Sequence, residues 1–269
     1  MTPGSEAIPR VGLGTFGLTG AEGIDAIHSA LSIGYRHLDT AQTYDTESTV
    51  GAAVARSGLD RGDVFVTTKV TAKNFPRLED SVDDSLATMG LDHADLVLIH
   101  WPGQHGEPPV KSYIGALARL QDAGKARLIG VSNFTRQLVD EAIAEIGDGR
   151  LAVNQVEQHV YLQNRLIADH CRDAGIAITA YMPLAGGQLD GDPVLDDIAA
   201  RHGAAASQIA LAYLLALGSI VIPKSATPAR QTSNLAARDI RLDVEDMARL
   251  AGLDRGRRYI NPEWGPDWV

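Results

Sequence analysis

Short apolar runs alternate with longer amphipathic stretches along almost the whole chain. The short runs are rich in Val, Ile and Leu, which is typical of strands that are buried on both faces of a parallel sheet. This pattern predicts eight strands, at residues 10–15, 35–40, 64–69, 95–100, 126–131, 151–156, 177–182 and 219–223.

The stretches between these runs place apolar residues at the spacing of a helix that buries one face. Many of them stop on a glycine, the residue that most readily takes the left-handed conformation that ends a helix. This pattern predicts helices at residues 21–34, 47–58, 77–90, 110–124, 135–147, 164–175, 193–203, 205–218, 228–238 and 243–253.

Strict alternation of strand and helix predicts right-handed crossovers and a parallel sheet. Eight such units favour an α/β fold of the (β/α)8 TIM-barrel type, with residues 1–269 as a single domain. An open doubly wound sheet is the alternative. It has less support, because the segment GLGTFG in and after the first strand is not a good GxGxxG nucleotide-binding fingerprint.

Composition and charge narrow the classes of partner. Of the 269 residues, 45% are hydrophobic and 22% are charged, and the net charge of −10 argues against a nucleic-acid or anionic-membrane partner. The single cysteine, Cys171, permits no internal disulfide and is expected in the core. The first residues lack the apolar core of a signal peptide, and no apolar run reaches the ~18 residues of a membrane span. We therefore expect a cytoplasmic protein, and separately we expect a monomer.

Titratable side chains stand at the ends of three successive predicted strands. These are Asp39, Lys69 and His100, and Tyr44 follows Asp39 within a short polar loop. The carboxyl ends of barrel strands meet at one mouth, so we expect the four side chains to converge there. A phenol is a weak acid unless a cation lowers its pKa, and Lys69 could be that cation while Asp39 holds it in place.

Each of these residues has a simpler interpretation when it is taken alone. A lone strand-end histidine such as His100 is more often a hydrogen-bonded core residue than a catalyst. A metal site is disfavoured, since the eight histidines show no HxH or HExxH spacing, and we expect no metal. A serine nucleophile is also disfavoured, because Ser132 lies in no GxSxG elbow. Only the joint placement at one mouth favours catalysis.

The chain resembles the aldo-keto reductases over nearly its whole length. Residues 34–51, 125–134 and 222–234 carry the likeness, and the motifs LIHWP and NQVE agree with it in order and spacing. Within that family it is similar to the short bacterial members that reduce diketogluconate and methylglyoxal. The resemblance implies a (β/α)8 barrel that reduces small aldehydes and ketones with NADPH.

The resemblance also implies roles for particular residues. Tyr44 would be the general acid, Lys69 and Asp39 would tune its pKa, and His100 would orient the carbonyl group. The residues that would contact the cofactor NADPH are Ser132, Asn133 and Gln155 at the carboxamide, Tyr181 stacked on the nicotinamide, Leu184, then Lys224, Ser225 and Arg230 at the 2′-phosphate, and Ser233 and Asn234 at the adenine. Relatives more often carry Glu or Gln at the position of Ser233.

The substrate pocket is expected to have aromatic walls from Phe16, Trp101, Trp264 and Trp268. The last two belong to a C-terminal tail that should lie over the mouth. Few residues precede GLGTF, so the N-terminal hairpin of many relatives should be shortened. Two alternatives to a reductase stay open: a regulatory barrel that binds NADPH and turns over slowly, and an unrelated barrel lyase or isomerase that uses Lys69 and binds no nicotinamide.

Overall fold

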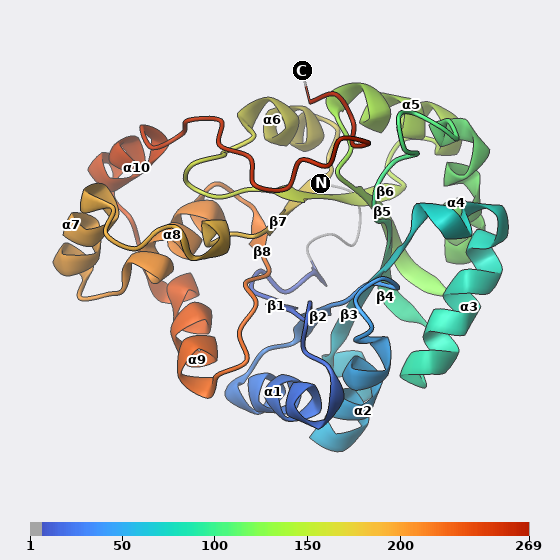
Figure 1. Ribbon diagram of the computed structural model, residues 1–269, viewed down its shortest axis with the longest axis horizontal. Coiled ribbons are helices and arrows are strands. Elements are labelled where there is room, and N and C mark those ends of the chain that lie inside the picture. The colour runs from blue at the N-terminus through green and yellow to red at the C-terminus, as the bar shows by residue number, and fades with distance from the viewer. Residues whose placement is uncertain (1–6, 269) are drawn as a thin grey trace.

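The computed structural model describes residues 7–268, and these contain one sheet of eight parallel strands in the order of the sequence. Figure 1 shows the strands gathered at the centre with the helices around them. The strands are β1 (Leu13–Gly14), β2 (His37–Asp39), β3 (Phe65–Val70), β4 (Ala94–Ile99), β5 (Ala126–Ser132), β6 (Leu151–Glu157), β7 (Ala177–Tyr181) and β8 (Ile220–Val221).

Two parallel bridges join the last strand region to the first. Val11 pairs with Val221 and Gly14 pairs with Lys224, and the amide of Gly12 donates to the carbonyl oxygen of Val221 at 2.8 Å. A Cβ atom on Gly14 would lie 2.8 Å from the carbonyl oxygen of Ile222, so only glycine permits this close approach. The predicted (β/α)8 barrel is confirmed, and all eight predicted strands are present.

Helices follow the strands as the amphipathic pattern predicted. The α-helices are α1 (Gly20–Ile33), α2 (Glu47–Ser57), α3 (Leu78–Met89), α4 (Ile114–Asp122), α5 (Arg136–Ile146), α6 (Arg165–Asp173), α7 (Pro193–His202), α8 (Ala206–Ala216), α9 (Pro228–Ala236) and α10 (Val244–Ala251). Short 3-10 turns, which the pattern did not predict, are η2 (Arg61–Asp63), η3 (Ala72–Arg77), η4 (Val110–Ser112), η5 (Ala185–Gly187) and η6 (Ala237–Asp239).

Local signals explain where these helices begin and end. The carboxylate of Asp192 accepts the amides of Val194 and Leu195, and Pro193 occupies the first turn of α7, where its missing N–H costs nothing. Gly58 and Gly90 end α2 and α3 in the left-handed region, at φ 70° and 66°.

The alternation of side chains along the strands separates two apolar layers. The first lies between the sheet and the helices and includes Val66 and Val70 of β3. The second, smaller cluster includes Phe65 of β3 and Leu96 and Leu98 of β4, so these residues point to the inside of the barrel. Lys69 follows Phe65 at an even spacing and therefore also points inward, at the carboxyl end of β3. As predicted, Cys171 is buried in the outer layer.

Two expectations concern the ends of the chain. Residues 1–6 lie outside the described part, and the predicted shortening of the N-terminal hairpin falls largely on them. The C-terminal tail does cross to the mouth, where the ring of Trp264 packs edge-on against that of Trp101 with centroids 5.2 Å apart. Within residues 7–268, no helix combines the length and apolar character that crossing a membrane requires.

Candidate active site

The four residues predicted to handle protons converge at the carboxyl end of the sheet. Asp39 ends β2, Lys69 lies near the end of β3, and His100 follows β4 directly. Lys69 Nζ lies 2.5 Å from Asp39 Oδ1 and 4.8 Å from the centre of the Tyr44 ring. Tyr44 Oη lies 3.5 Å from His100 Nε2. The phenol thus has a cation on one side and an imidazole on the other.

Lys69 and Asp39 form a buried ion pair, and each oxygen of the carboxylate accepts a hydrogen bond. Their side chains are 0% and 2% exposed. The second oxygen of Asp39 accepts Gln155 Nε2 at 2.8 Å, and Lys69 also donates to the carbonyl oxygen of Thr40 at 2.8 Å. Burial lowers the pKa of Lys69, but Asp39 and Tyr44 together raise it by more, so that its net pKa is raised. The lysine therefore stays charged inside the barrel.

Burial dominates the acidity of Tyr44. It raises the pKa of the phenol, Lys69 lowers that pKa, and Asp39 raises it, with a raised net value. Lys69 thus lowers the pKa of Tyr44, as the sequence predicted, but burial raises this pKa by more. A phenol with a raised pKa is fully protonated at neutral pH and can serve as a proton donor.

His100 is held in its neutral form. Burial, and after it the charge of Lys69, lower the pKa of His100 to about 3. Its Nδ1 lies 3.4 Å from the hydroxyl of Thr43, and its carbonyl oxygen accepts Asn133 Nδ2 at 3.0 Å. If the Thr43 hydroxyl donates to Nδ1, the ring carries its proton on Nε2, the nitrogen that faces Tyr44.

This low pKa predicts that His100 does not titrate between pH 5 and 8. An unfolded histidine has a pKa of about 6.5. As the pH falls below that value the unfolded chain takes up the proton first, so His100 lowers the free energy of unfolding progressively down to its folded pKa of about 3. NMR titration of the imidazole resonances, assigned with a His100→Gln variant, measures this directly. A His100 signal with a midpoint near pH 6.5 would contradict it.

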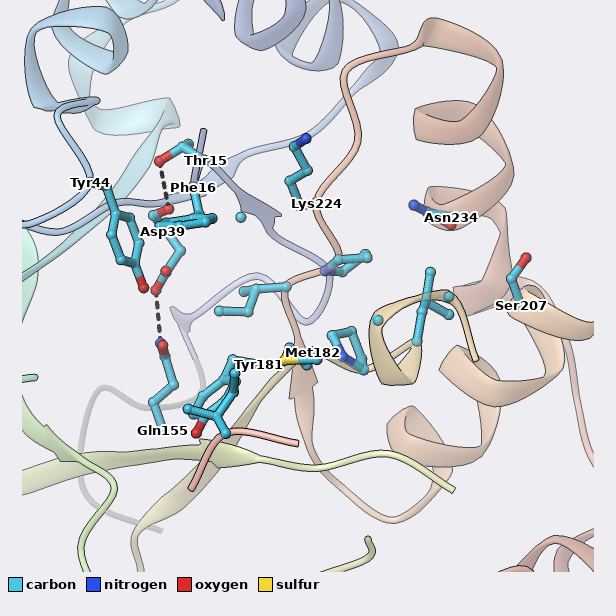
Figure 2. Close-up of a pocket in the computed structure, with 18 of the residues that line it drawn as sticks. Thr15, Phe16, Asp39, Tyr44, Gln155, Tyr181, Met182, Ser207, Lys224 and Asn234 are labelled. Atoms are coloured by element: carbon cyan, nitrogen blue, oxygen red, sulfur yellow. Dashed lines mark hydrogen bonds between the residues drawn. The ribbon is translucent and has the colours of Figure 1, made fainter. Parts of the chain in front are cut away.

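One cavity of about 800 Å³ runs across the mouth from this group to α9. At one end it is lined by Phe16, Tyr44, His100 and Trp101, and at the other by Lys224, Arg230, Ser233 and Asn234. Figure 2 shows Tyr44, Asp39 and Phe16 on one side of this space and Lys224, Asn234 and Ser207 on another, with Tyr181 and Gln155 below. The volume suits a drug-sized or cofactor-sized ligand.

Most of the predicted cofactor contacts line this cavity. Besides those named above, they are Ser132, Asn133, Gln155, Tyr181 and Leu184. Ser225 does not line it; its hydroxyl instead accepts the amide of Thr227 at the turn before α9. Trp264 and Trp268 do not line it either; both pack edge-on against Trp101, which does. Their expected contact with substrate stays a prediction.

Side-chain amides present polar groups to the middle of the cavity. Asn133, which has a φ of 62°, donates to the hydroxyl of Ser132 and accepts the hydroxyl of Tyr181 at 2.9 Å, fixing the tyrosine ring. Gln155 donates to Asp39, while its Oε1 accepts no hydrogen bond within residues 7–268. An acceptor of this kind, beside a fixed aromatic ring, fits a planar carboxamide ligand.

The far end of the cavity is a local exception to the negative charge of the protein. Lys224 follows β8, and Arg230 lies in the first turn of α9, where the helix dipole also favours an anion. Both side chains are exposed, and neither forms an ion pair with any residue that the structure describes. Two exposed cations, one of them in the first turn of a helix, fit a phosphate group.

One side of the cavity was not predicted from the sequence. Much of that side is the loop after β7, including Met182, Pro183, Gly186 and Gly187. Other lining residues that were not predicted are Gly14, Thr15, Leu189, Asp190, Ser207, Ile222, Pro223 and Ile260. The Gly-Gly pair was the available signal, since Gly186 and Gly187 have φ of 63° and 87°. Ser207 carried no such signal, because only the folded chain brings α8 to this cavity, whereas Ile260 belongs to the tail that was expected over the mouth.

Comparison with known proteins gives a consistent result. Residues 10–255 match the model of the aldo/keto reductase family. Methylglyoxal reductase DkgB of Escherichia coli O157:H7 is 42% identical over 97% of this chain and 99% of its own length. Morphine 6-dehydrogenase of Pseudomonas putida is 38% identical over 97% and 90%. The crystal structure of a proposed 2,5-diketo-D-gluconic acid reductase B superposes with a TM-score of 0.94 at 41% identity, covering 100% of this chain and 96% of the other.

Proposed function

The chain belongs to the aldo/keto reductase family, and from that premise we propose that it reduces small aldehydes and ketones with NADPH, with Tyr44 as the proton donor. The observation that carries the proposal is the placement of chemical groups at the two ends of one cavity. A protonated phenol flanked by Lys69 and His100 lies at one end, and two exposed cations, Lys224 and Arg230, lie at the other.

Tyr44, His100 and Lys69 each have a separate role in the proposed proton transfer. The nicotinamide ring, when bound, supplies the hydride. Tyr44 Oη transfers its proton to the carbonyl oxygen as negative charge develops there, and the neutral His100 donates a hydrogen bond from Nε2 to the same oxygen. Lys69 stabilises the phenolate that Tyr44 becomes, and Asp39 holds Lys69 within reach. General acid catalysis of this kind contributes about 10²- to 10⁴-fold.

Asn133, Gln155 and Tyr181 would hold the nicotinamide end of the cofactor, and Lys224 and Arg230 its 2′-phosphate. The aromatic walls at the catalytic end, Phe16 and Trp101, would face the substrate. Since similar proteins are described as reductases of methylglyoxal and of diketogluconate, we propose 2-oxoaldehydes and keto sugars as the substrate class.

A substrate panel tests the proposed function. NADPH oxidation would be followed with methylglyoxal, 2,5-diketogluconate and aromatic aldehydes, and turnover of at least one of them is expected. Tight NADPH binding without turnover would favour a regulatory barrel instead. Absence of nicotinamide binding would favour the lyase or isomerase alternative.

Replacing Arg230 by alanine is expected to weaken NADPH binding by about 1–3 kcal/mol, the range for a charged hydrogen bond. Binding of NADH should change little, because NADH lacks the 2′-phosphate. Titration of the intrinsic fluorescence with each cofactor measures both constants. Arg136→Ala is the matched control, since Arg136 is also exposed but lies on α5, outside the cavity. Equal loss for the two cofactors in Arg230→Ala would contradict the assignment.

A further inference from the structure

A carboxylate that the proposed chemistry does not use is buried at the end of β6. Glu157 is the last residue of β6, and its side chain is 0% exposed. Its Oε1 accepts the amide of Tyr259 at 2.7 Å, and its Oε2 accepts the amide of Ile260 at 2.8 Å. The Nε2 atom of His159 lies 3.0 Å from Oε1. A buried carboxylate is costly unless such bonds compensate it, and here two successive main-chain amides do so.

These amides belong to residues 258–268, which we call the C-terminal strap. In Figure 1 the strap is the dark red stretch that leads to the C label. It is tied at more than one point. The guanidinium of Arg258 ties it to the loop before α6 by donating to Asn164 Oδ1 at 3.1 Å. Within the strap, the same guanidinium lies 3.7 Å from the centre of the Trp268 ring. Asn164 in turn donates to the carbonyl oxygen of Glu157.

The strap forms or supports two walls of the cavity. Ile260 lines the cavity itself. Trp264 packs against Trp101, another lining residue, and its carbonyl oxygen accepts the amide of His105 at 3.1 Å. The position of the strap therefore decides where Ile260 and Trp101 stand.

We infer that Glu157 is a positioning residue, which fixes the C-terminal strap through two main-chain amides and thereby sets the substrate end of the cavity. The effect on catalysis rests on the proposed function, whereas the anchoring does not. Within residues 7–268, the carboxylate of Glu157 forms no hydrogen bond with Asp39, Tyr44, Lys69 or His100. Its loss should therefore change substrate binding more than the chemical step.

Glu157→Gln tests the inference at nearly constant side-chain volume. The amide turns an NH2 group toward one of the two strap amides, where two donors would meet. We expect KM for methylglyoxal to rise about tenfold, the scale of one lost charge-assisted hydrogen bond. The kcat value should stay within about threefold of wild type, and NADPH affinity should not change, because Lys224 and Arg230 are untouched.

Tryptophan fluorescence reports the position of the strap without substrate or cofactor. The chain has three tryptophans, of which Trp264 and Trp268 lie in the strap and Trp101 packs against both. Glu157→Gln should shift the emission to longer wavelength and increase quenching by acrylamide, as the released rings become hydrated.

Asp95→Asn is the matched control. Asp95 is also a buried carboxylate, paired with Arg61 and Arg127, but it lies at the opposite end of the barrel, near the start of β4. This variant should lower Tm while leaving KM and tryptophan emission unchanged, which separates anchoring of the strap from a general loss of stability. If Glu157→Gln does not fold, Ile260→Pro removes one strap amide from a partly exposed position and should give the same emission change.

The outcomes separate the inference from the function it rests on. Unchanged emission in folded Glu157→Gln would overturn the anchor. Changed emission with unchanged KM would overturn its role in substrate binding. Changed emission in a protein whose wild type reduces no carbonyl compound would support the anchor and refute the proposed function.

Discussion

Tyr44→Phe is expected to lower kcat for carbonyl reduction by at least about 10²-fold, the low end for a lost general acid. The substitution removes one oxygen atom, and the ring can keep its edge-on contacts with Phe16 and His100, at centroid distances of 5.1 and 5.4 Å. Folding and NADPH binding should therefore survive. The loss should appear in kcat more than in KM, because the proton moves only in the transition state.

Steady-state kinetics across the substrate panel measure this loss. Tyr113→Phe provides the control, because Tyr113 is a buried tyrosine that stacks on Phe75 outside the cavity, and its variant should keep wild-type kcat. Retention of most of the reductase activity by Tyr44→Phe would refute the proposed mechanism even if the fold and the cofactor are right.

Lys69→Met should reduce kcat by a similar factor and should also destabilise the protein. The catalytic loss arises because the phenolate of Tyr44 would form without its cation. The loss of stability arises because Asp39 would remain buried and, among residues 7–268, would keep only Gln155 as a donor to its side chain. Breaking a buried ion pair by removing one partner typically costs about 3–5 kcal/mol. Chemical denaturation and kinetics on the same sample measure both effects.

Two double variants separate these effects of Lys69. Adding Asp39→Asn to Lys69→Met removes the stranded charge, so much of the stability should return while activity stays low. Adding Tyr44→Phe should cost little activity beyond either single change, since the two groups act as a unit. Additive losses in kcat would show that Lys69 acts independently of Tyr44.

Strand periodicity was enough to predict much of the site. Asp39 and His100 stand where apolar runs stop, and because barrel strands all end at one mouth, their positions in the sequence predicted that they would lie together. The same alternation turns Lys69 into the barrel, whereas Asn154, one residue before Gln155, points outward and donates to the carbonyl oxygen of Phe134. A strand-end position alone therefore did not decide which polar side chain reaches the cavity.

Other features depended on contacts between distant segments. Glu157 was visible as a polar strand end, but its partners are main-chain amides about a hundred residues later, and backbone groups carry no sequence signal. The sequence indicated that Lys69 would make Tyr44 more acidic, but the opposing effect of burial depends on the packing around the ring. Trp264 and Trp268 were expected at the mouth as part of the C-terminal tail, but only the folded chain shows that they pack against Trp101 and do not line the cavity.

The seam of the barrel, where the first strand region pairs with the last, affects how the protein folds. Gly14 and Lys224 pair across that seam and both line the cavity, although they lie near opposite ends of the chain. The entropy of closing so long a loop must be overcome before this contact contributes, and contacts of such long sequence separation slow folding. A dinucleotide that needs Lys224 in place would bind only the closed ring, and at a hundred times its Kd would stabilise it by about 2.7 kcal/mol. The cofactor would thus act as a folding ligand, pulling a partly assembled barrel towards its finished state.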